Sequence, residues 1–324
     1  MKFGSILATG LFTASVLAHN EILSRSEISR RDAMAKRCAA QTAQFQKRRH
    51  AKRMAKRAVE LEERAANSSV IINTEGLYYE NIQNNTCVLT PEVTEGPYVW
   101  PRSQTLRMDM TEGEAGIPLT LDVGILDMAT CEPLENALVS FWHCNATGSY
   151  SSFTHLSPNT RFEELLQQKN ITDFQIGVTD LHTDDTTFLR GMWPTNSEGV
   201  MEMKTIFPGF YVERAIHIHT QVFTDWTVRS NGTVSSGNLV NTGQLYFDEE
   251  VSAKLMALEP YVSHTEINRT TNDVDSQGIF DQSLVGGYNP VISVVPLDGE
   301  NIENGVVGYI TMGVDTTALE DGTS

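Results

Sequence analysis

The sequence TIFPGFYVERAIHIHTQVF, residues 205–223, contains a tyrosine, an arginine and two histidines within a stretch that otherwise has the composition of a β-strand. Histidines two positions apart on a strand project from the same face, so His217 and His219 can present both imidazoles to one point in space. Tyr211 and Arg214 precede them closely. The stretch is therefore a candidate site, whose meaning depends on the rest of the chain.

Short β-rich runs broken by turn residues fill the chain after Cys87. Strands are predicted at 117–128, 137–144, 200–207, 215–224, 289–297 and 305–314, and helical stretches at 161–170 and 248–262. Many short strands of period two favour an antiparallel sandwich or barrel. We predict an all-β fold: one antiparallel β-sandwich domain over 87–315, with a few short helices and long loops, followed by a tail at 316–324.

The first residues have the pattern of a secretory signal peptide. Lys2 is followed by the apolar run SILATGLFTASVLA, with Val16 and Ala18 at the small-residue cleavage positions. This run is too short to cross a membrane, and no later stretch reaches the roughly 18 apolar residues that a spanning helix needs. We therefore predict a signal peptide at 1–18 and a secreted, extracellular protein without a membrane partner.

Residues 19–57 differ in composition from everything that follows. Residues 1–57 hold 13 of the 24 lysines and arginines but 3 of the 41 acidic residues, leaving 11 basic and 38 acidic residues, a net charge of −27, for the remainder. Repeated basic pairs indicate a basic propeptide at 19–57, cut after Lys56-Arg57. The residues that follow, 58–86, are predicted to be a polar linker that is partly helical near 59–66. The acidic body would be repelled by phosphates, which argues against a nucleic-acid partner.

Glycosylation sequons and cysteines support export. Six Asn-x-Ser/Thr sequons occur, at Asn67, Asn84, Asn145, Asn170, Asn231 and Asn268. Cys38 would leave with the propeptide, and Cys87, Cys131 and Cys144 would then supply one disulfide and one free thiol, with the pairing open. The spacing of a structural zinc site is absent from the sequence.

Tyr150 extends the candidate site, because it follows a predicted strand and a glycine-containing turn in FWHCNATGSYS, residues 141–151. A strand end holds the backbone rigid while the side chain stays accessible. Phenolate oxygen is a hard anionic donor and imidazole is intermediate, so two tyrosines with two histidines favour a hard trivalent ion, Fe³⁺. A site that stays ferric would activate an organic substrate rather than oxygen directly, and a catechol suits that role because its two oxygens chelate the metal.

Four motifs together resemble the intradiol ring-cleaving dioxygenases, which include the catechol and protocatechuate enzymes. They are WH-x-N-x-x-G-x-Y at 142–150, LRG at 189–191, KTIFPGFY at 204–211 and RAIHIH at 214–219, and LTPEVTEGPY at 89–98 resembles the family's opening segment. The resemblance implies a non-haem Fe³⁺ site with Tyr150, Tyr211, His217 and His219 as ligands.

The resemblance also implies roles and a reaction. Tyr211 would be the axial ligand that leaves the metal when the catechol binds, and Arg214 would stabilise negative charge developing on the substrate. Gln244 resembles a polar residue that lines the family's pocket. Both atoms of O₂ would be inserted between the two hydroxyl-bearing carbons, giving a muconate-type diacid.

The chain also departs from the family's cytosolic catechol enzymes. Residues 153–185 look like an insertion beside the pocket, so the identity of the catechol stays open. No helical dimerisation domain precedes the predicted domain, and both a monomer and a homodimer fit the sequence. In having a predicted signal peptide and several sequons, the chain resembles the secreted fungal branch of the family.

Two alternative functions do not require these residues to be catalytic. A non-catalytic secreted β-sandwich that binds a glycan or a protein could retain these motifs as scaffold, and a ferric-binding protein without turnover could retain the ligands. Among the other histidines, His143 is expected to be structural beside an inward-packed Trp142. His155, His182 and His264 are assigned no role.

Overall fold

All six strands predicted from the sequence are present in a computed structural model, which describes residues 25–66, 89–100, 105–230 and 234–318. The predicted signal peptide at 1–18 lies outside these residues, as does Cys87. The strand predicted at 289–297 is shorter than expected, because only Ser293–Pro296 pairs continuously. Three short strands and two longer ones, at Arg190–Pro194 and Asn238–Tyr246, were not predicted.

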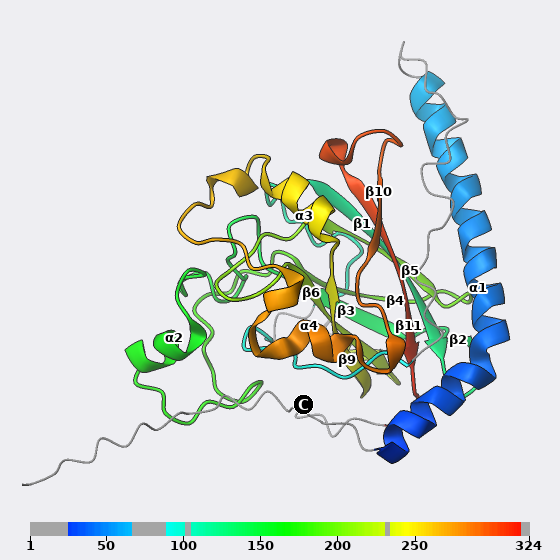
Figure 1. Cartoon of the computed structure of the whole chain (residues 1–324), viewed down its shortest axis with the longest axis horizontal. Helices are drawn as coiled ribbons and strands as arrows, with labels where there is room; N and C mark the ends of the chain where they lie inside the picture. Colours follow the sequence, from blue (N-terminus) through cyan, green and yellow to red (C-terminus); the bar gives the residue numbers. More distant parts are fainter. Residues whose placement is uncertain (1–24, 67–88, 101–104, 231–233, 319–324) are drawn as a thin grey trace, which may run out of the picture.

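Two β-sheets pack face to face (Figure 1). The first contains β1 (Pro118–Asp127), β2 (Glu132–Pro133), β5 (Val200–Ile206), β10 (Ser293–Pro296) and β11 (Val306–Val314). The second runs in the order β4 (Arg190–Pro194), β3 (Leu138–Trp142), β6 (His217–Thr224) and β9 (Asn238–Tyr246), and β7 (Thr227–Val228) pairs separately with β8 (Val234–Ser235). The β-sandwich is thus confirmed, with one difference: β1 and β11 pair in parallel, so the first sheet is mixed.

The main core lies between the two sheets. Leu121 and Val123 of β1 and Ile218 and Val222 of β6 are fully buried in one apolar cluster. Each such side chain contributes about 1.5–3 kcal/mol by leaving water. Because side chains alternate along a strand, burying these residues fixes which neighbours face outward on each sheet.

Helices cover the ends and one side of the sandwich. α2 (Phe162–Gln168) and α3 (Glu249–Met256) confirm the two helical predictions, and the Asp248 carboxylate caps α3 by accepting hydrogen bonds from the backbone of Glu250 and Val251. Shorter helical turns are η2 (Tyr261–Ser263), η3 (Asn272–Val274), η4 (Ser276–Gly278), α4 (Ile279–Ser283), η5 (Val285–Gly287) and η6 (Ile302–Asn304). In the described part of the chain, no helix is both long and apolar enough to cross a membrane.

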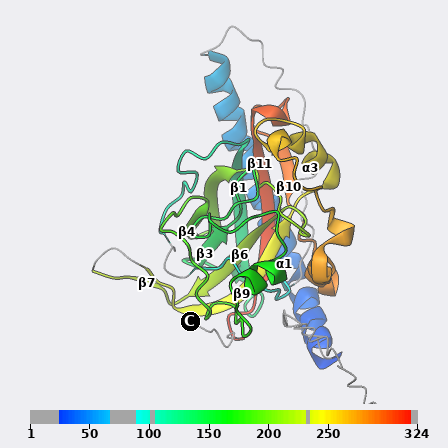
Figure 2. The ribbon, with the colours of Figure 1, turned by 90° about the vertical axis from the view of Figure 1, so that its left-hand side faces the viewer.

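The basic segment is a long helix, α1 (Arg25–Ala66), that lies along the first sheet (Figures 1 and 2). The sequence had suggested a helix only near 59–66. Met34, Cys38 and Phe45 are buried, and their spacing of four and seven places them on one stripe of the helix. They join Leu126 and Met128 in an apolar cluster outside the main core.

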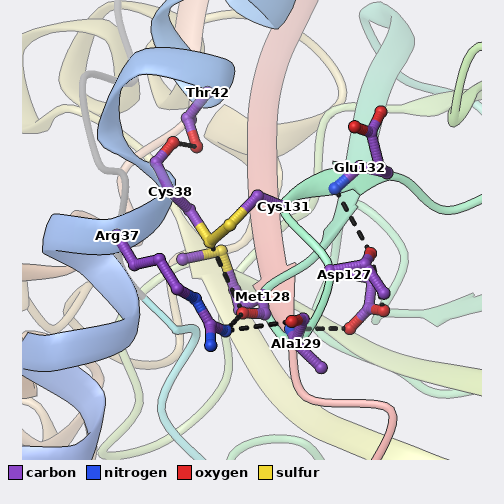
Figure 3. Close-up of a disulfide and its surroundings, with 9 residues drawn as sticks. Arg37, Cys38, Thr42, Asp127, Met128, Ala129, Cys131 and Glu132 are labelled. Carbon is purple, nitrogen blue, oxygen red and sulfur yellow. Dashed lines mark hydrogen bonds between the residues drawn. A yellow bond between two sulfur atoms is a disulfide. The ribbon is translucent and has the colours of Figure 1, made fainter.

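A disulfide between Cys38 and Cys131 joins α1 to the turn between β1 and β2 (Figure 3). This corrects the expectation that Cys38 would leave the protein and that the one disulfide would form among Cys87, Cys131 and Cys144. Cys144 is a buried free thiol. Beside the disulfide, Arg37 Nη2 donates to the carbonyl oxygens of Met128 and Ala129 at 2.6 and 3.0 Å. Removal of 19–57 stays a prediction, but the disulfide would keep a cleaved α1 attached.

Opposite charges complete the contact between α1 and the first sheet. The fully buried Asp122 of β1 accepts from Arg49 Nε at 2.9 Å and forms an ion pair with Arg53, which also pairs with Glu202 of β5. Gly124 allows this close approach, because a Cβ there would lie 2.9 Å from the Phe45 ring and 2.6 Å from Arg49 Nη1. The basic residues of α1 therefore serve as counter-ions for an acidic sheet face.

We predict that α1 stays covalently attached after the chain is cut between it and β1. A recognition site for a sequence-specific protease, inserted between residues 67 and 88, would allow that cut. The two fragments should migrate together on a non-reducing denaturing gel and separate after reduction. The Cys38→Ser variant should release the fragment without reductant, and release from the unsubstituted protein without reductant would contradict the prediction.

Candidate metal centre

The outer face of the second sheet carries a cross-strand row of polar and aromatic side chains. Ile218 of β6 points into the core, so His217 and His219 project from the opposite face. The strand register sets Trp142 of β3 and Gln244 of β9 on either side of His219. Two imidazoles therefore share one face of a rigid central strand.

Two tyrosines reach this face from loops. Tyr150 lies in the loop after β3, and Tyr211 follows β5. The two loops are joined where the backbone N–H of Gly209 donates to the carbonyl oxygen of Asn145 at 3.2 Å. This hydrogen bond joins two loops that are distant in sequence, and both phenol rings lie over β6.

The polar ends of these four side chains converge. The Tyr211 hydroxyl lies 3.3 Å from His217 Nε2, which lies 3.1 Å from His219 Nε2. The Tyr150 ring centroid is 5.6 Å from that of Tyr211 and 6.1 Å from that of His219. All four residues are at least nine-tenths buried. The structure thus brings together the residues that the sequence singled out.

Hydrogen bonding leaves donor atoms available to a metal ion. His217 Nδ1 lies 2.7 Å from the Ala215 carbonyl oxygen, which can only accept, so this nitrogen carries the proton and Nε2 of the neutral ring has a free lone pair. Two nitrogens bound about 2.1 Å from one ion, at right angles, would be about 3 Å apart. The buried Tyr150 hydroxyl interacts with Tyr211 and makes no well-formed hydrogen bond to the described residues. These features fit a shared cation.

Burial holds the four groups in their neutral forms. It raises the pKa of Tyr150 well above its ordinary value, aided by the nearby Tyr211. Burial raises the pKa of Tyr211 to about 12, although the Arg214 charge acts in the opposite direction. Burial and the charge of Arg214 lower the pKa of His217 to about 3, and burial with the proximity of His217 lowers that of His219. A bound trivalent cation would reverse the preference of the phenols, since it stabilises phenolate.

Aromatic residues enclose the donors. Trp142 stacks on His219 with a centroid distance of 4.9 Å, and Tyr98 stacks on Tyr150 at 4.6 Å. Leu156, Leu165 and Leu181 from the insertion at 153–185 belong to the same buried cluster as the two tyrosine ligand candidates. The insertion therefore packs beside the site, where the sequence had suggested that it lies.

The LRG motif holds the loop of Tyr150 in place. Arg190 Nε donates to Ser151 Oγ at 2.9 Å, and Nη2 donates to the carbonyl oxygens of Ser151 and Tyr98, each at 2.8 Å. Burial lowers the pKa of Arg190 to about 9, which leaves it charged at neutral pH. Ser151, which directly follows Tyr150, is thus joined through Arg190 to the segment that carries Tyr98.

Arg214 approaches the site with one edge of its guanidinium. Nη1 donates to the Tyr211 hydroxyl at 3.4 Å, while Nη2 donates to Gln244 Oε1 at 2.6 Å. Gln244 Nε2 in turn donates to the Thr94 carbonyl oxygen at 2.9 Å. Gln244 therefore fixes Arg214 and the segment at 89–100, and its amide is engaged with both.

Four other histidines of the described domain, at 143, 155, 182 and 264, lie outside this group of four side chains. His143 is buried with Nδ1 2.8 Å from the Cys144 carbonyl oxygen and Nε2 2.7 Å from Thr205 Oγ1, as expected of a structural residue. His182 stacks on Trp100, His264 on Phe210, and His155 is exposed. Among the described residues, no group of three or more His, Cys, Asp or Glu side chains could hold a metal. The candidate centre depends on its two tyrosines.

Two polar residues at the site were missed by the sequence analysis. Tyr246 follows Gln244 by two positions on β9 and shares its face, so recognising β9 as a strand would have found it. Asp275 binds Arg214 Nε at 2.9 Å. It lies in an irregular segment between η3 and η4, where no local pattern marks it.

Comparisons with known proteins agree with the motif resemblance. Residues 94–251 match a family model described as Dioxygenase. The intradiol ring-cleavage dioxygenase from Tetranychus urticae has a TM-score of 0.57 and 26% identity over 72% of this chain and 97% of that chain. A second solved dioxygenase has a TM-score of 0.54 and 25% identity over 72% and 97%. No curated protein sequence matched. The resemblance and the fold of this family's catalytic domain are therefore confirmed.

We predict that Gly96→Ala weakens metal binding through His219. Gly96 has a φ of +71°, and a Cβ there would lie 2.9 Å from His219 Cε1. Gly113→Ala is the matched control, because Gly113 has a φ of +81° with no atom within 4 Å. Both variants should lose about 1 kcal/mol of stability through the backbone.

Iron titration of the metal-free variants, with thermal unfolding alongside, checks this prediction. Gly96→Ala should bind ferric iron at least about tenfold more weakly than Gly113→Ala, since a displaced imidazole misaligns one donor. Equal affinities in the two variants would show that Gly96 does not set the position of His219.

Proposed function

Because the domain that contains residues 94–251 is related to the intradiol ring-cleavage dioxygenases, we propose that the protein is a non-haem Fe³⁺ enzyme that cleaves catechol-type aromatics with O₂. The convergence of two tyrosine and two histidine side chains at one buried point carries the proposal. Phenolate and imidazole together favour a hard trivalent ion. Tyr150, Tyr211, His217 and His219 would hold it.

The bound ion would supply Lewis-acid chemistry, lowering the pKa values of the catechol hydroxyls and drawing the substrate into position for reaction with O₂. The chain's own residues supply the surroundings. Trp142 and Tyr98 shield the donors from water by stacking on His219 and Tyr150. Charges in such a water-poor site interact more strongly than in solvent.

Arg214 supplies a fixed positive charge beside the reacting groups. Its Nη1 already donates to the Tyr211 hydroxyl, so it stabilises negative charge on that oxygen or on a substrate oxygen in its place. The proposed reaction breaks the bond between the two hydroxyl-bearing carbons and adds both atoms of O₂, converting catechol to a muconate-type diacid with no other reactant. Gln244 is proposed to act through Arg214, to which it is hydrogen-bonded.

We further propose that the protein acts outside the cell. The Cys38–Cys131 disulfide supports this, since disulfides persist mainly in oxidising compartments. The exposed sequon residues Asn170 and Asn268 can accept glycans. Asn145 is a poorer acceptor, because its side-chain amide donates to Glu114 and its Oδ1 accepts from the backbone of Ser149.

The purified protein, loaded with ferric iron, should show a phenolate-to-iron absorption band and consume O₂ with a catechol. An oxygen electrode with catechol, protocatechuate, hydroxyquinol and larger diphenols checks activity and identifies the preferred substrate class. Tyr211→Phe should shift the band, whereas Tyr288→Phe, a buried tyrosine in the main core, should leave it unchanged.

His219→Ala should lower iron content and turnover by about 100-fold or more, and His155→Ala, which removes an exposed imidazole, should alter neither. A coloured protein that consumes no O₂ with any of these diphenols would indicate ferric binding without turnover. A colourless protein that remains inactive after ferric reconstitution would favour a non-catalytic binding domain.

A further inference from the structure

Asp275 is a buried carboxylate that the motifs do not include, and it lies beyond the residues matched by the dioxygenase family model. Its side chain is 0% exposed. Oδ1 accepts from Arg214 Nε and from the backbone N–H of Ala215, at 2.9 and 2.8 Å. Oδ2 accepts from Arg214 Nη2, the Tyr246 hydroxyl and the backbone N–H of Phe280, each at 3.2 Å. Both oxygens are thus fully engaged.

The two bonds to Arg214 determine which edge of the guanidinium faces the site. Nε and Nη2 bind Asp275, and Nη2 also binds Gln244, so Nη1 is the nitrogen that reaches Tyr211. The guanidinium is planar and its donors have a fixed geometry, so holding one edge in a bidentate pair orients the other.

The same carboxylate also steadies the start of β6. Its Oδ1 holds the N–H of Ala215, whose carbonyl oxygen accepts from His217 Nδ1 at 2.7 Å. That bond sets the tautomer and ring orientation of His217. One buried carboxylate therefore connects the charged side chain and one of the imidazoles.

We propose that Asp275 is a positioning residue that holds Arg214 Nη1 toward the substrate and supplies the charge that allows Arg214 to be buried. The catalytic part of this inference rests on the proposed function. A guanidinium buried without a counter-ion would be costly. Because Nε and Nη2 are paired with Asp275, Arg214 stays ionised, and its Nη1 faces negative charge that develops in the site.

The test compares Asp275→Asn with Asp273→Asn, an exposed carboxylate in η3 close along the chain. Asp275→Asn should lower kcat by about 10- to 100-fold while KM changes less than about threefold, because a misplaced charge acts mainly on the transition state. Asp273→Asn should match the unsubstituted enzyme. Unchanged kcat in a folded Asp275→Asn protein would overturn the proposal.

A double-substitution cycle separates positioning from general damage. If Asp275 acts through Arg214, then adding Asp275→Asn to Arg214→Met should change kcat less than about threefold. The double variant should also unfold at a higher temperature than Arg214→Met alone, since it removes the unpaired carboxylate. Additive losses in kcat would overturn the proposal.

A measurement on iron-free protein keeps this inference distinct from the proposed function. The Arg214 Nε–H should give a slowly exchanging NMR signal that is lost in Asp275→Asn and kept in Asp273→Asn. If no catechol is turned over but this pattern holds, the proposed function fails and the positioning stands. A signal unchanged in Asp275→Asn would overturn the positioning.

Should Asp275→Asn fail to fold, Asp275→Glu provides the test, because it keeps the compensating charge and moves it by one methylene. The expected result is an altered Nε–H signal with kcat lowered about 3- to 30-fold. An unaltered signal with full kcat would overturn the proposal.

Discussion

The alternation of side chains along β6 is the constraint on which the site depends. Ile218 and Val222 must face the core to close the sandwich, and this burial alone forces His217 and His219 onto the opposite face. A register slip by one residue would exchange the two sets, exposing apolar side chains and burying the imidazoles between the sheets. The packing energy of the core thereby fixes the direction of the imidazoles.

Two buried charges in this chain, Asp122 and Arg214, are balanced by residues distant in sequence. Asp122 is neutralised by Arg49 and Arg53 of α1, and Arg214 by Asp275. Arg49 also donates to Ile310 and Thr311, and Asp275 also accepts from Ala215, Tyr246 and Phe280, which makes burial of these charges tolerable. From the net charges of its two parts, the sequence suggested a removable basic arm and an acidic body. Composition alone does not show which opposite charges will pair in the folded chain.

The sequence predicted six strands and two helices but missed β4 and β9, for instructive reasons. β4 contains Gly191 and ends with Pro194, both poor strand formers. β9 reads as polar because Asn241, Thr242 and Gln244 lie along it, although all three are buried. Thr242 and Gln244 lie on the face that carries His219, and the side-chain amides of Asn241 and Gln244 donate to the segment at 89–100. The polar character that hid this strand reflects its position under the site.

The sequence by itself determined the sandwich and the residue types of the candidate centre, because period-two patterns and short motifs are local properties. Tertiary structure alone decided the covalent attachment of α1, the partner of Cys131 and the place of Asp275 behind Arg214. Each of these contacts joins segments far apart in the chain. Chain folding, and no pattern within either segment, brings their atoms within bonding distance.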